Sequence, residues 1–424
     1  MPSWLTSPQA ARLFGQPLLR IKGQRANGRE PKLSKVNRVL VVRLDEVGDV
    51  VMTTPFLREL RRNLPHAWIT LVVKPAVYNL VELCPYVNEV LTYDWNTQGS
   101  LSHLRLHMRA LVLAWKHLWR RRFDLAVLPR WDEDRYNGTF LAFFSGATWR
   151  VGYSENVIEN KRQFNNGYDR LLTHVLDDKT PKHEVLRNLD VIRHLGGTVK
   201  EDKLELWLNS EDELFAEHFL NLQGVSPNDL LTVFGPGKRD LKRRWPLSRF
   251  IELGAWLKEK YKARILVVGE EKEEILGAEL QQQLGDIVIN MVGQTNLRQA
   301  VALLKHCHLY VGNDYGPKHM AAAVGVPVIE INGHPQGAST LHHHSPSRFG
   351  PWCIPHRVVQ PNTSLSPCSD ACIDGQENCI IGVSLQEVKD AVVAQLLLRD
   401  DPIVSKRVST PAVDLHRKKA GVKA

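Results

Sequence analysis

Residues 308–331 contain the feature that most constrains the fold of this chain. Two short apolar runs enclose a polar, glycine-containing turn and a stretch of small residues, which predicts strand, turn, short helix and strand. Gly316 lets the backbone turn sharply, and Pro317 suits the first position of a helix, where no N–H is needed. The start of such a helix offers free amides and a partial positive charge. The turn, flanked by Asp314 and His319, is therefore a candidate site for a phosphate or diphosphate; the alternative is an ordinary connection with a hydrogen-bonded histidine.

Short apolar runs alternate with helical stretches along most of the chain. We expect strands near residues 39–42, 68–73, 90–93, 123–128, 230–234, 264–268, 287–291, 308–311 and 328–331. This alternation predicts an α/β protein with parallel sheets that are covered on both faces. Residues 334–380 are rich in proline and histidine, and we expect them to form an irregular loop region.

The positive charge of the chain is concentrated at its ends. The formal net charge is +9, of which residues 1–38 contribute +7 and residues 405–424 contribute +5, so the body between them is mildly acidic. An acidic body argues against nucleic acid as a partner. The basic ends fit flexible arms that contact an anionic membrane surface, and they fit solvated disorder as well.

The apolar segments of the chain are short. None approaches the ~18–20 residues of a membrane span, and the first residues lack the continuous apolar core of a signal peptide, so we expect a cytoplasmic protein. The helical stretch 101–122 carries leucine, methionine and tryptophan at helical spacing beside several arginines. An ordinary surface helix explains this pattern; a face for a membrane or an acidic acceptor is the alternative.

The six cysteines fall into two groups. Cys84 and Cys307 lie in apolar surroundings and are expected in the core. The other four, in the loop-rich region, are Cys353, Cys368, Cys372 and Cys379. They lack the paired C-x-x-C spacing of a zinc ribbon, and both reduced thiols that pack the loop and a structural metal or cluster remain open. Three successive histidines at 342–344, with Cys353, suggest metal binding, but successive residues cannot all point at one site, so a metal site there is the less favoured interpretation.

Charged loops follow several of the expected strands. Neither half carries the glycine fingerprint of dinucleotide-binding proteins or a P-loop, which argues against a hydride-transfer enzyme and a P-loop NTPase. The loop that begins at Gly235 contains five basic residues: Lys238, Arg239, Lys242, Arg243 and Arg244. Such a group can neutralise a diphosphate. Four charged residues follow the strand near 123–128, at the edge where ligands bind open α/β sheets: Arg130, Asp132, Asp134 and Arg135.

Asp49 follows Gly48 where the first expected strand gives way to a helix. A carboxylate at this point can cap the helix and stabilise it by ~0.5–2 kcal/mol. It can equally act as a general base at the mouth of a cleft, where it takes the proton of an attacking hydroxyl group. The residues alone leave both interpretations open.

Together these segments resemble the heptosyltransferases of glycosyltransferase family 9, which build the inner core of lipopolysaccharide. The matching motifs are RLDEVGDVVMTTP at 43–55, FDL at 123–125, RVG at 150–152, FGPG at 234–237, RRWP at 243–246, N-D-x-G-x-x-H-x-A-A at 313–322, G-x-P at 325–327 and the late cysteines. The resemblance implies a GT-B fold, in which two Rossmann-like domains face each other across a cleft and the last helix crosses back to the first domain. It also implies an inverting glycosyltransferase that moves heptose from a nucleotide-activated donor, typically ADP-heptose, to a lipopolysaccharide inner-core acceptor, without a metal or other cofactor.

On this resemblance the chain divides into five segments. They are a basic extension (1–37), an acceptor-binding domain (38–208), a nucleotide-sugar-binding domain (209–383), a crossing-back helix (384–399) and a basic tail (400–424). The expected partners are the nucleotide sugar and a lipopolysaccharide precursor. Peripheral contact with the inner face of the inner membrane would bring the enzyme to that precursor.

The resemblance also assigns roles by position. Asp49 matches the catalytic base of the family, and Arg243 falls where the family usually has a lysine that contacts phosphate. The donor contacts are expected from Gly235, Lys238, Arg243, Glu270, Asp314, Tyr315, Gly316 and His319. The acceptor contacts are expected from Gly48, Arg130 and Asp132.

Two residues depart from the family pattern. Tyr315 replaces the usual threonine or serine, and Arg243 replaces lysine, which keeps the charge but changes the geometry. The tyrosine removes a small hydroxyl group near the diphosphate. Two alternatives therefore stay open: a nucleotide-sugar-binding protein with a degenerate site, and a transferase that uses a different donor sugar. A metal or redox protein built on the cysteine cluster is a third.

Overall fold

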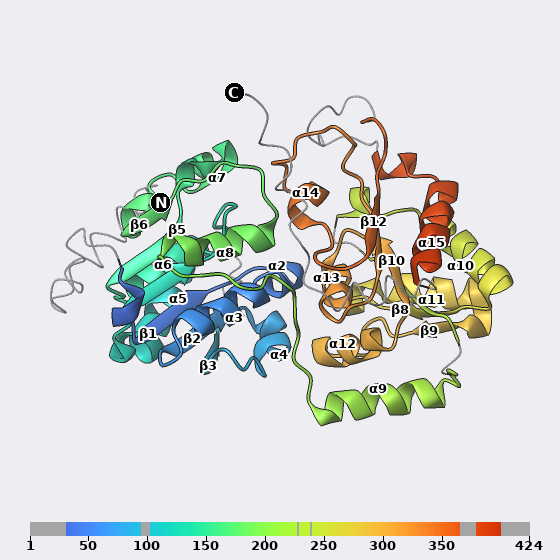
Figure 1. The fold of residues 1–424 in the computed structure, drawn as a ribbon, viewed down its shortest axis with the longest axis horizontal. Coiled ribbons are helices and arrows are strands. Elements are labelled where there is room, and N and C mark those ends of the chain that lie inside the picture. Colours follow the sequence, from blue (N-terminus) through green and yellow to red (C-terminus); the bar gives the residue numbers. More distant parts are fainter. Residues whose placement is uncertain (1–30, 95–101, 227–228, 238–239, 365–378, 400–424) are drawn as a thin grey trace, which may run out of the picture.

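The computed structural model describes residues 31–94, 102–226, 229–237, 240–364 and 379–399. Within them the chain forms two six-stranded sheets, one in each half of the molecule (Figure 1). All strand pairs in both sheets are parallel. The strand order is β3-β2-β1-β4-β5-β6 in the first sheet and β12-β11-β10-β7-β8-β9 in the second. The two halves thus repeat one doubly wound topology, and the two Rossmann-like domains of the implied GT-B fold are confirmed.

The strands of the first sheet are β1 (Arg38–Val42), β2 (Trp68–Val73), β3 (Glu89–Thr92), β4 (Leu125–Leu128), β5 (Trp149–Tyr153) and β6 (His174–Leu176). Those of the second sheet are β7 (Leu231–Gly235), β8 (Arg264–Val267), β9 (Val288–Asn290), β10 (Leu309–Asn313), β11 (Val328–Ile331) and β12 (His356–Val359). Sequence patterns predict nine of these strands. They miss β5, β6 and β12; β6 and β12 lie at sheet edges, where half-exposed positions blur the apolar signal.

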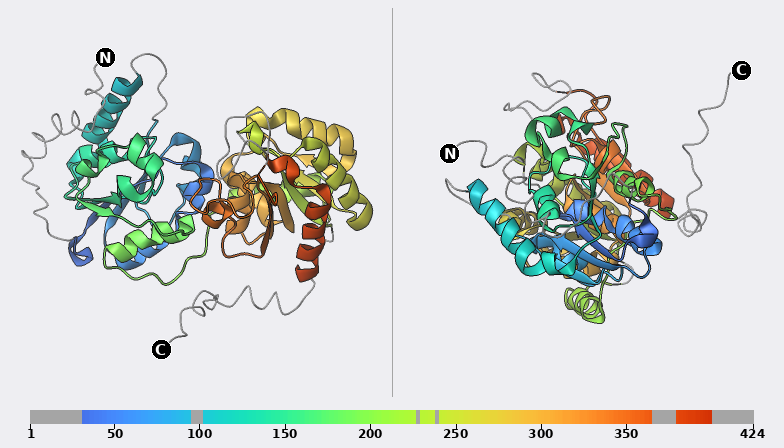
Figure 2. Two further views of the ribbon diagram at one scale, coloured as in Figure 1. Left: turned by 90° about the horizontal axis from the view of Figure 1, so that it is seen from above. Right: turned by 90° about the vertical axis from the view of Figure 1, so that its left-hand side faces the viewer.

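The helices of the first half are α2 (Val47–Val51), α3 (Thr54–Asn63), α4 (Tyr78–Val81), α5 (Ser102–Leu113), α6 (Gly138–Phe144), α7 (Glu159–Phe164) and α8 (Glu184–His194). Those of the second half are α9 (Ser210–Leu222), α10 (Leu247–Tyr261), α11 (Glu274–Leu284), α12 (Leu297–Lys305), α13 (Gly316–Ala323), α14 (Pro346–Phe349) and α15 (Leu385–Arg399). Two further views show the halves side by side, joined by the extended segment before α9 (Figure 2).

We expected the last helix to cross back to the first half, but α15, the last described helix, stays in the second half. It packs on α10, β11 and β12, which all belong to the second half. Its buried Val388 and Val392 belong to the apolar core of that half. Because this buried stripe covers the second sheet, α15 completes its own half, and the loop around α14 reaches the first half instead.

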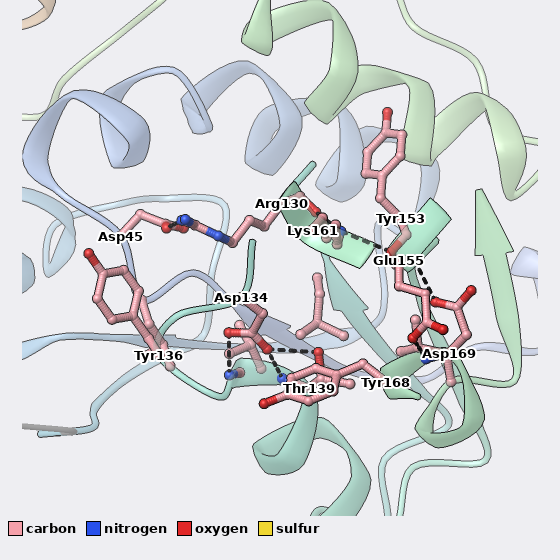
Figure 3. Close-up of a pocket in the computed structure, with 16 residues that line it drawn as sticks. Asp45, Arg130, Asp134, Tyr136, Thr139, Tyr153, Glu155, Lys161, Tyr168 and Asp169 are labelled. Atoms are coloured by element: carbon pink, nitrogen blue, oxygen red, sulfur yellow. Dashed lines mark hydrogen bonds and ion pairs between the residues drawn. The ribbon is translucent and has the colours of Figure 1, made fainter. Parts of the chain in front are cut away.

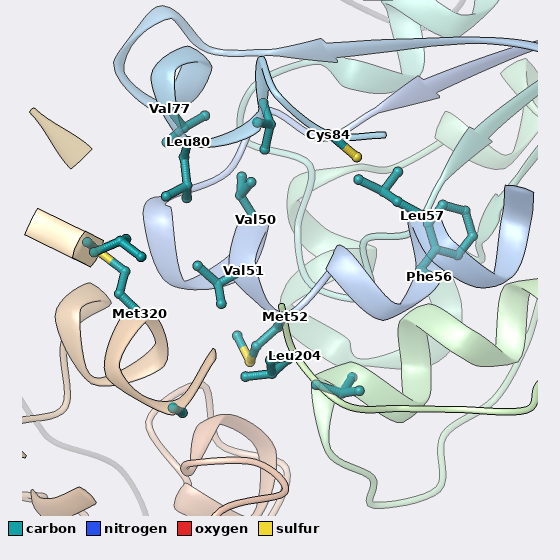
Figure 4. Close-up of a cluster of buried hydrophobic side chains, with 14 of the residues drawn as sticks. Val50, Val51, Met52, Phe56, Leu57, Val77, Leu80, Cys84, Leu204 and Met320 are labelled. Atoms are coloured by element: carbon teal, nitrogen blue, oxygen red, sulfur yellow. The ribbon is translucent and has the colours of Figure 1, made fainter. Parts of the chain in front are cut away.

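The two halves also share one apolar cluster. Val51 of α2 and Met52, the residue after it, lie beside Met320 of α13, with Leu204 of the connecting segment next to them (Figure 4). All four side chains are at least 90% buried. This contact places the first helix of one half against the helix that follows β10 in the other. Among the residues that the structure describes, no helix combines the length and hydropathy needed to cross a membrane.

Candidate active site

A cleft of about 1140 Å³ lies between the two halves. Ten of the predicted site residues line it: Gly48, Asp49, Arg130 and Asp132 from the first half, and Arg243, Glu270, Asp314, Tyr315, Gly316 and His319 from the second. Gly235 does not line it; a β-carbon there would meet the Tyr310 hydroxyl group at 2.0 Å, so this glycine makes room for a buried tyrosine. Lys238 lies outside the described residues.

The topology explains why these residues meet. They follow the carboxyl ends of strands β1, β4, β7, β8 and β10. In each sheet the chain reverses its winding direction between two adjacent strands, β1 and β4 in the first half and β7 and β10 in the second. Ligands of open α/β sheets bind in the crevice at such a reversal. The two crevices face each other and form one cleft.

The starts of α2 and α13 touch across this cleft. A β-carbon at Gly48 would lie 2.8 Å from Cδ2 of His319, and a β-carbon at Gly316 would lie 3.2 Å from Cβ of Val47. Both glycines are therefore needed for close approach of the two backbones. A ligand at this point lies beside the helix starts, where it can meet groups from both halves.

Asp49 is the third residue of α2 and not its N-cap, which is Glu46. The capping interpretation is therefore wrong. Its carboxylate faces the cleft with 26% of the side chain exposed, and Oδ1 lies 3.5 Å from Nη2 of Arg43. Burial raises the pKa of Asp49 to about 6; Arg43 opposes this shift, and the negative charges of Glu184, Asp132 and Glu46 add to it. A carboxylate with this pKa is ionised at neutral pH and is a stronger base than an exposed one.

Arg43 holds in place the turn between β1 and α2, which leads to Asp49. It is buried, and Nη1 donates a hydrogen bond of 2.6 Å to the carbonyl oxygen of Pro129, at the end of the neighbouring strand β4. Its Nε lies 3.1 Å from the buried carboxylate of Asp45. Arg130 pairs with that same carboxylate. These contacts tie the turns after β1 and β4 together, so Asp45 is structural while Asp49 faces the cleft.

On the opposite wall a chain of buried charges holds Asp314. One carboxylate oxygen pairs with Arg243, and the other accepts a 2.6 Å hydrogen bond from Lys318 Nζ. Lys318 is fully buried and also lies 2.8 Å from Glu330, whose other oxygen accepts a 2.6 Å hydrogen bond from Asn332. Burial raises the pKa of Glu330, and the Lys318 ammonium group opposes that shift. These linked ion pairs and hydrogen bonds fix the position of the Arg243 guanidinium group at the cleft.

Tyr315 connects two turns of the second half. It precedes α13, and its hydroxyl group donates a hydrogen bond to Glu270, which follows β8. Burial and the neighbouring carboxylate raise the pKa of the Tyr315 hydroxyl group well above its usual value, so it remains a donor. A rigid phenol ring therefore stands where the family resemblance implies a small hydroxyl side chain.

Asp132 is held by a side chain from the other half. Nη2 of Arg348, on α14, donates a 2.7 Å hydrogen bond to Asp132 and another of 2.7 Å to Glu184. The guanidinium group is fully buried and lies over the ring of Trp131, 4.7 Å from its centroid. Although burial alone would raise it, the pKa of Asp132 is lowered by Arg348. Through these two hydrogen bonds, Arg348 joins the loop around α14 to the segments of the first half that carry Asp132 and Glu184.

The histidine and cysteine motifs do not form a metal site within the described chain. No three histidine, cysteine, aspartate or glutamate side chains there are placed to hold an ion. His343 and His344 line the cleft, and burial lowers the pKa of the adjacent His342 to about 4. Cys84 and Cys307 are buried, as expected. Cys353 is exposed and Cys379 is buried, while Cys368 and Cys372 lie outside the described residues.

A second hollow of about 30 Å³ lies inside the first half, next to the cleft (Figure 3). Asp134 borders it and accepts hydrogen bonds from the amides of Gly138 and Thr139, so this predicted cleft residue instead satisfies the first two amides of α6. Lys161 Nζ donates to the carbonyl oxygens of Trp131 and Tyr153, and burial lowers its pKa to about 8. The hollow has room for water and is far smaller than the sites of drug-sized ligands.

Sequence reasoning missed four residues that shape the site: Arg43, Lys318, Glu330 and Arg348. Glu330 carried a usable signal, because a single charge inside the apolar run 328–331 needs a buried partner. Lys318, on the helix of small residues before that strand, was the candidate partner. Arg348 gave no such signal, since residues 334–380 were expected to be irregular and its partners come from the other half.

The sequence of this chain is similar to those of known heptosyltransferases. The sequence model of glycosyltransferase family 9 (heptosyltransferase) matches residues 113–371. A lipooligosaccharide heptosyltransferase 2 of Haemophilus ducreyi is 25% identical over 304 residues, which cover 68% of this chain and 81% of the relative.

Two solved structures share the fold. A family 9 glycosyltransferase of Veillonella parvula superposes with a TM-score of 0.72 at 21% identity, covering 88% of this chain and 99% of its own. The ADP-heptose lipopolysaccharide heptosyltransferase II of Escherichia coli superposes with a TM-score of 0.62 at 21% identity, covering 86% and 100%.

Proposed function

This chain belongs to glycosyltransferase family 9, the heptosyltransferases, and on that basis we propose that it transfers heptose from ADP-heptose to an inner-core sugar of a lipopolysaccharide precursor, with inversion at the anomeric carbon. The names of the H. ducreyi and E. coli proteins support this donor and acceptor class. The observation that carries the proposal is the placement of Asp49 on one wall of the cleft and Arg243 and the start of α13 on the other.

In the proposed reaction, Asp49 takes the proton of an acceptor hydroxyl group. The hydroxyl oxygen forms a bond to the anomeric carbon as the bond from that carbon to the diphosphate breaks. The electron pair of the broken bond leaves with ADP, and the negative charge that develops there is stabilised by Arg243 and the positive end of α13. Attack from the side opposite the leaving group inverts the anomeric carbon.

Each half has a separate task in this proposal. Residues 38–208 present the acceptor, with Gly48, Arg130 and Asp132 near the base. Residues 209–383 hold the nucleotide sugar through Arg243, Glu270, Asp314 and the start of α13. The acceptor is anchored in lipid, so we propose that the enzyme works at the inner face of the inner membrane.

Donor binding and transfer test the proposal separately. Calorimetry with ADP-, UDP-, GDP- and CMP-sugars is expected to select ADP-heptose. Asp49→Asn is expected to bind that donor within about threefold of the wild type and to lower transfer ~10²–10⁴-fold, the range for a lost general base. Asp286→Asn, which changes a carboxylate that is 92% exposed and outside the cleft, is the control. Near-normal turnover of Asp49→Asn would remove Asp49 from the role of base.

A different donor sugar is the second candidate, and Tyr315 favours it. The phenol ring and its bond to Glu270 reduce the space beside the start of α13. If this ring selects the sugar, Tyr315→Ser will widen the range of donors accepted, and Tyr315→Phe will not. Donor binding by the wild type without transfer to any lipopolysaccharide precursor would instead indicate a degenerate site.

A further inference from the structure

Helix α5 and the turn of π-helix that follows it, Ala114–Leu118, carry an exposed apolar stripe. Met108, Val112 and Trp115 expose 50%, 42% and 63% of their surface. They lie at i, i+4 and i+7 and so share one face of the helix. The opposite face of the helix packs on the first half, where Ala110, Ala114 and Leu118 are fully or almost fully buried in a core cluster. The stripe is therefore a second apolar face that folding does not need.

The charges around this stripe are all of one sign along the helix. Residues 101–123 contain six arginine and lysine residues and no aspartate or glutamate. Arg109, Lys116 and Arg120 are exposed, and Arg109 lies 3.7 Å from Asp94 on the preceding loop. A helix with tryptophan and aliphatic side chains among cations is typical of proteins that lie in the interface of an anionic bilayer.

A second copy of the chain is a poorer partner for this face. A two-fold contact through the stripe would bring the same cations of both copies together. Like charges set against each other at an interface cost several kcal/mol, and residues 101–123 offer no carboxylate to offset them. An anionic bilayer meets the same cations with opposite charge and accepts the apolar side chains between its headgroups.

We propose that the α5 face, defined as Met108, Val112 and Trp115 with the neighbouring Arg109, Lys116 and Arg120, docks on the surface of an anionic lipid bilayer. Figure 2 shows α5 projecting from one edge of the first half, clear of the second half. The benefit of docking rests on the proposed function, since it brings the acceptor-binding half to a lipid-anchored acceptor. The binding itself can be measured without any catalysis.

Vesicle flotation of the full-length protein tests the proposal. The wild type is expected to float with vesicles that contain phosphatidylglycerol, to lose most of this binding in 0.5 M salt, and to bind phosphatidylcholine vesicles at least ~10-fold more weakly. The variant Met108→Ser/Val112→Ser/Trp115→Ser keeps both basic ends and is expected to bind anionic vesicles at least ~10-fold more weakly than the wild type. Lys116→Glu/Arg120→Glu should lose binding to the same vesicles.

The matched control removes exposed apolar surface elsewhere. Leu214→Ser/Leu222→Ser changes two side chains of α9 that are 63% and 69% exposed, and it should bind like the wild type. Equal binding by the triple serine variant and the wild type would overturn the proposal. So would a wild-type dimer, seen by light scattering, that the triple variant converts to a monomer, because the stripe would then serve a second copy.

Activity on two acceptors separates docking from the proposed function. With a water-soluble, deacylated acceptor the triple serine variant should turn over like the wild type, and with a vesicle-bound acceptor it should be slower. A wild type that binds vesicles through α5 but transfers no sugar would refute the proposed function and leave the docking surface standing.

Discussion

The imidazole ring of His319 lies against the α-carbon of Gly48. A β-carbon at residue 48 would come within 2.8 Å of Cδ2 of that ring, closer than real side chains approach. Gly48 stands one residue before the proposed base, and His319 belongs to the helix whose start faces the proposed diphosphate. This contact therefore sets the distance between the two walls of the cleft.

Gly48→Ala should separate these walls. The added methyl group must push the His319 ring or α2 aside, and we expect transfer to fall by about tenfold or more, because small displacements of reacting groups are costly. Donor affinity, measured by calorimetry, should fall less. Gly152→Ala is the control, since its β-carbon would find contacts of 3.4–3.5 Å, which are ordinary. Unchanged transfer in Gly48→Ala would show that the contact does not position the site.

Asp49→Asn should stabilise the protein near neutral pH. The pKa of Asp49 is raised from 3.8 to about 6 in the folded state. Between these two values the folded protein holds a proton that the unfolded protein has lost, so the free energy of unfolding falls as the pH rises through this range and stays low above it. Removing that charge is expected to raise the free energy of unfolding by about 1–2 kcal/mol at pH 7.5. The difference between variant and wild type should vanish below about pH 4. Urea unfolding at several pH values measures it, and a less stable variant at pH 7.5 would contradict the argument.

The rate of transfer should rise with pH through about 6, as Asp49 loses its proton. Arg348→Met is expected to move this rise to higher pH, because it leaves the negative charges of Asp132 and Glu184 near Asp49 without their cation. Arg43 and Glu46 also face Asp49 and stay unchanged. Arg348→Lys, which keeps the charge, should restore the position of the rise; a profile that is the same in all three proteins would limit Arg348 to a structural role.

Lys318→Met should destabilise the second half strongly. It leaves the fully buried Glu330 without its partner at 2.8 Å, and breaking a buried ion pair from one side costs about 3–5 kcal/mol. Adding Glu330→Gln should recover part of this stability, since the buried charge is then gone. Calorimetry with ADP should show no recovery of affinity in the double variant, because Asp314 still lacks its 2.6 Å bond from Lys318. Full recovery of binding would show that Lys318 acts on stability alone.

Local patterns predicted much of the fold and site. Nine of the twelve strands follow from apolar runs, and the charged residues after β1, β4, β7 and β10 were predicted from the strand ends that precede them. Glu270, after β8, was assigned by the family resemblance. The patterns failed where burial is partial, as in β6 and β12, and where a helix has two possible partners. The apolar stripe of α15 predicts burial but not against which half, and the structure places it on the second.

The sequence by itself determined the local order of strand, turn and helix, because hydrophobic period, Gly316 and Pro317 act within a few residues of one another. Only the tertiary structure decided that His319 rests on Gly48, that Lys318 pairs with Glu330, and that Arg348 holds Asp132 across the cleft. The reason is that these contacts join segments that meet only when each sheet has formed and the two halves approach. Their energies depend on burial and charge in three dimensions, which no spacing along the chain records.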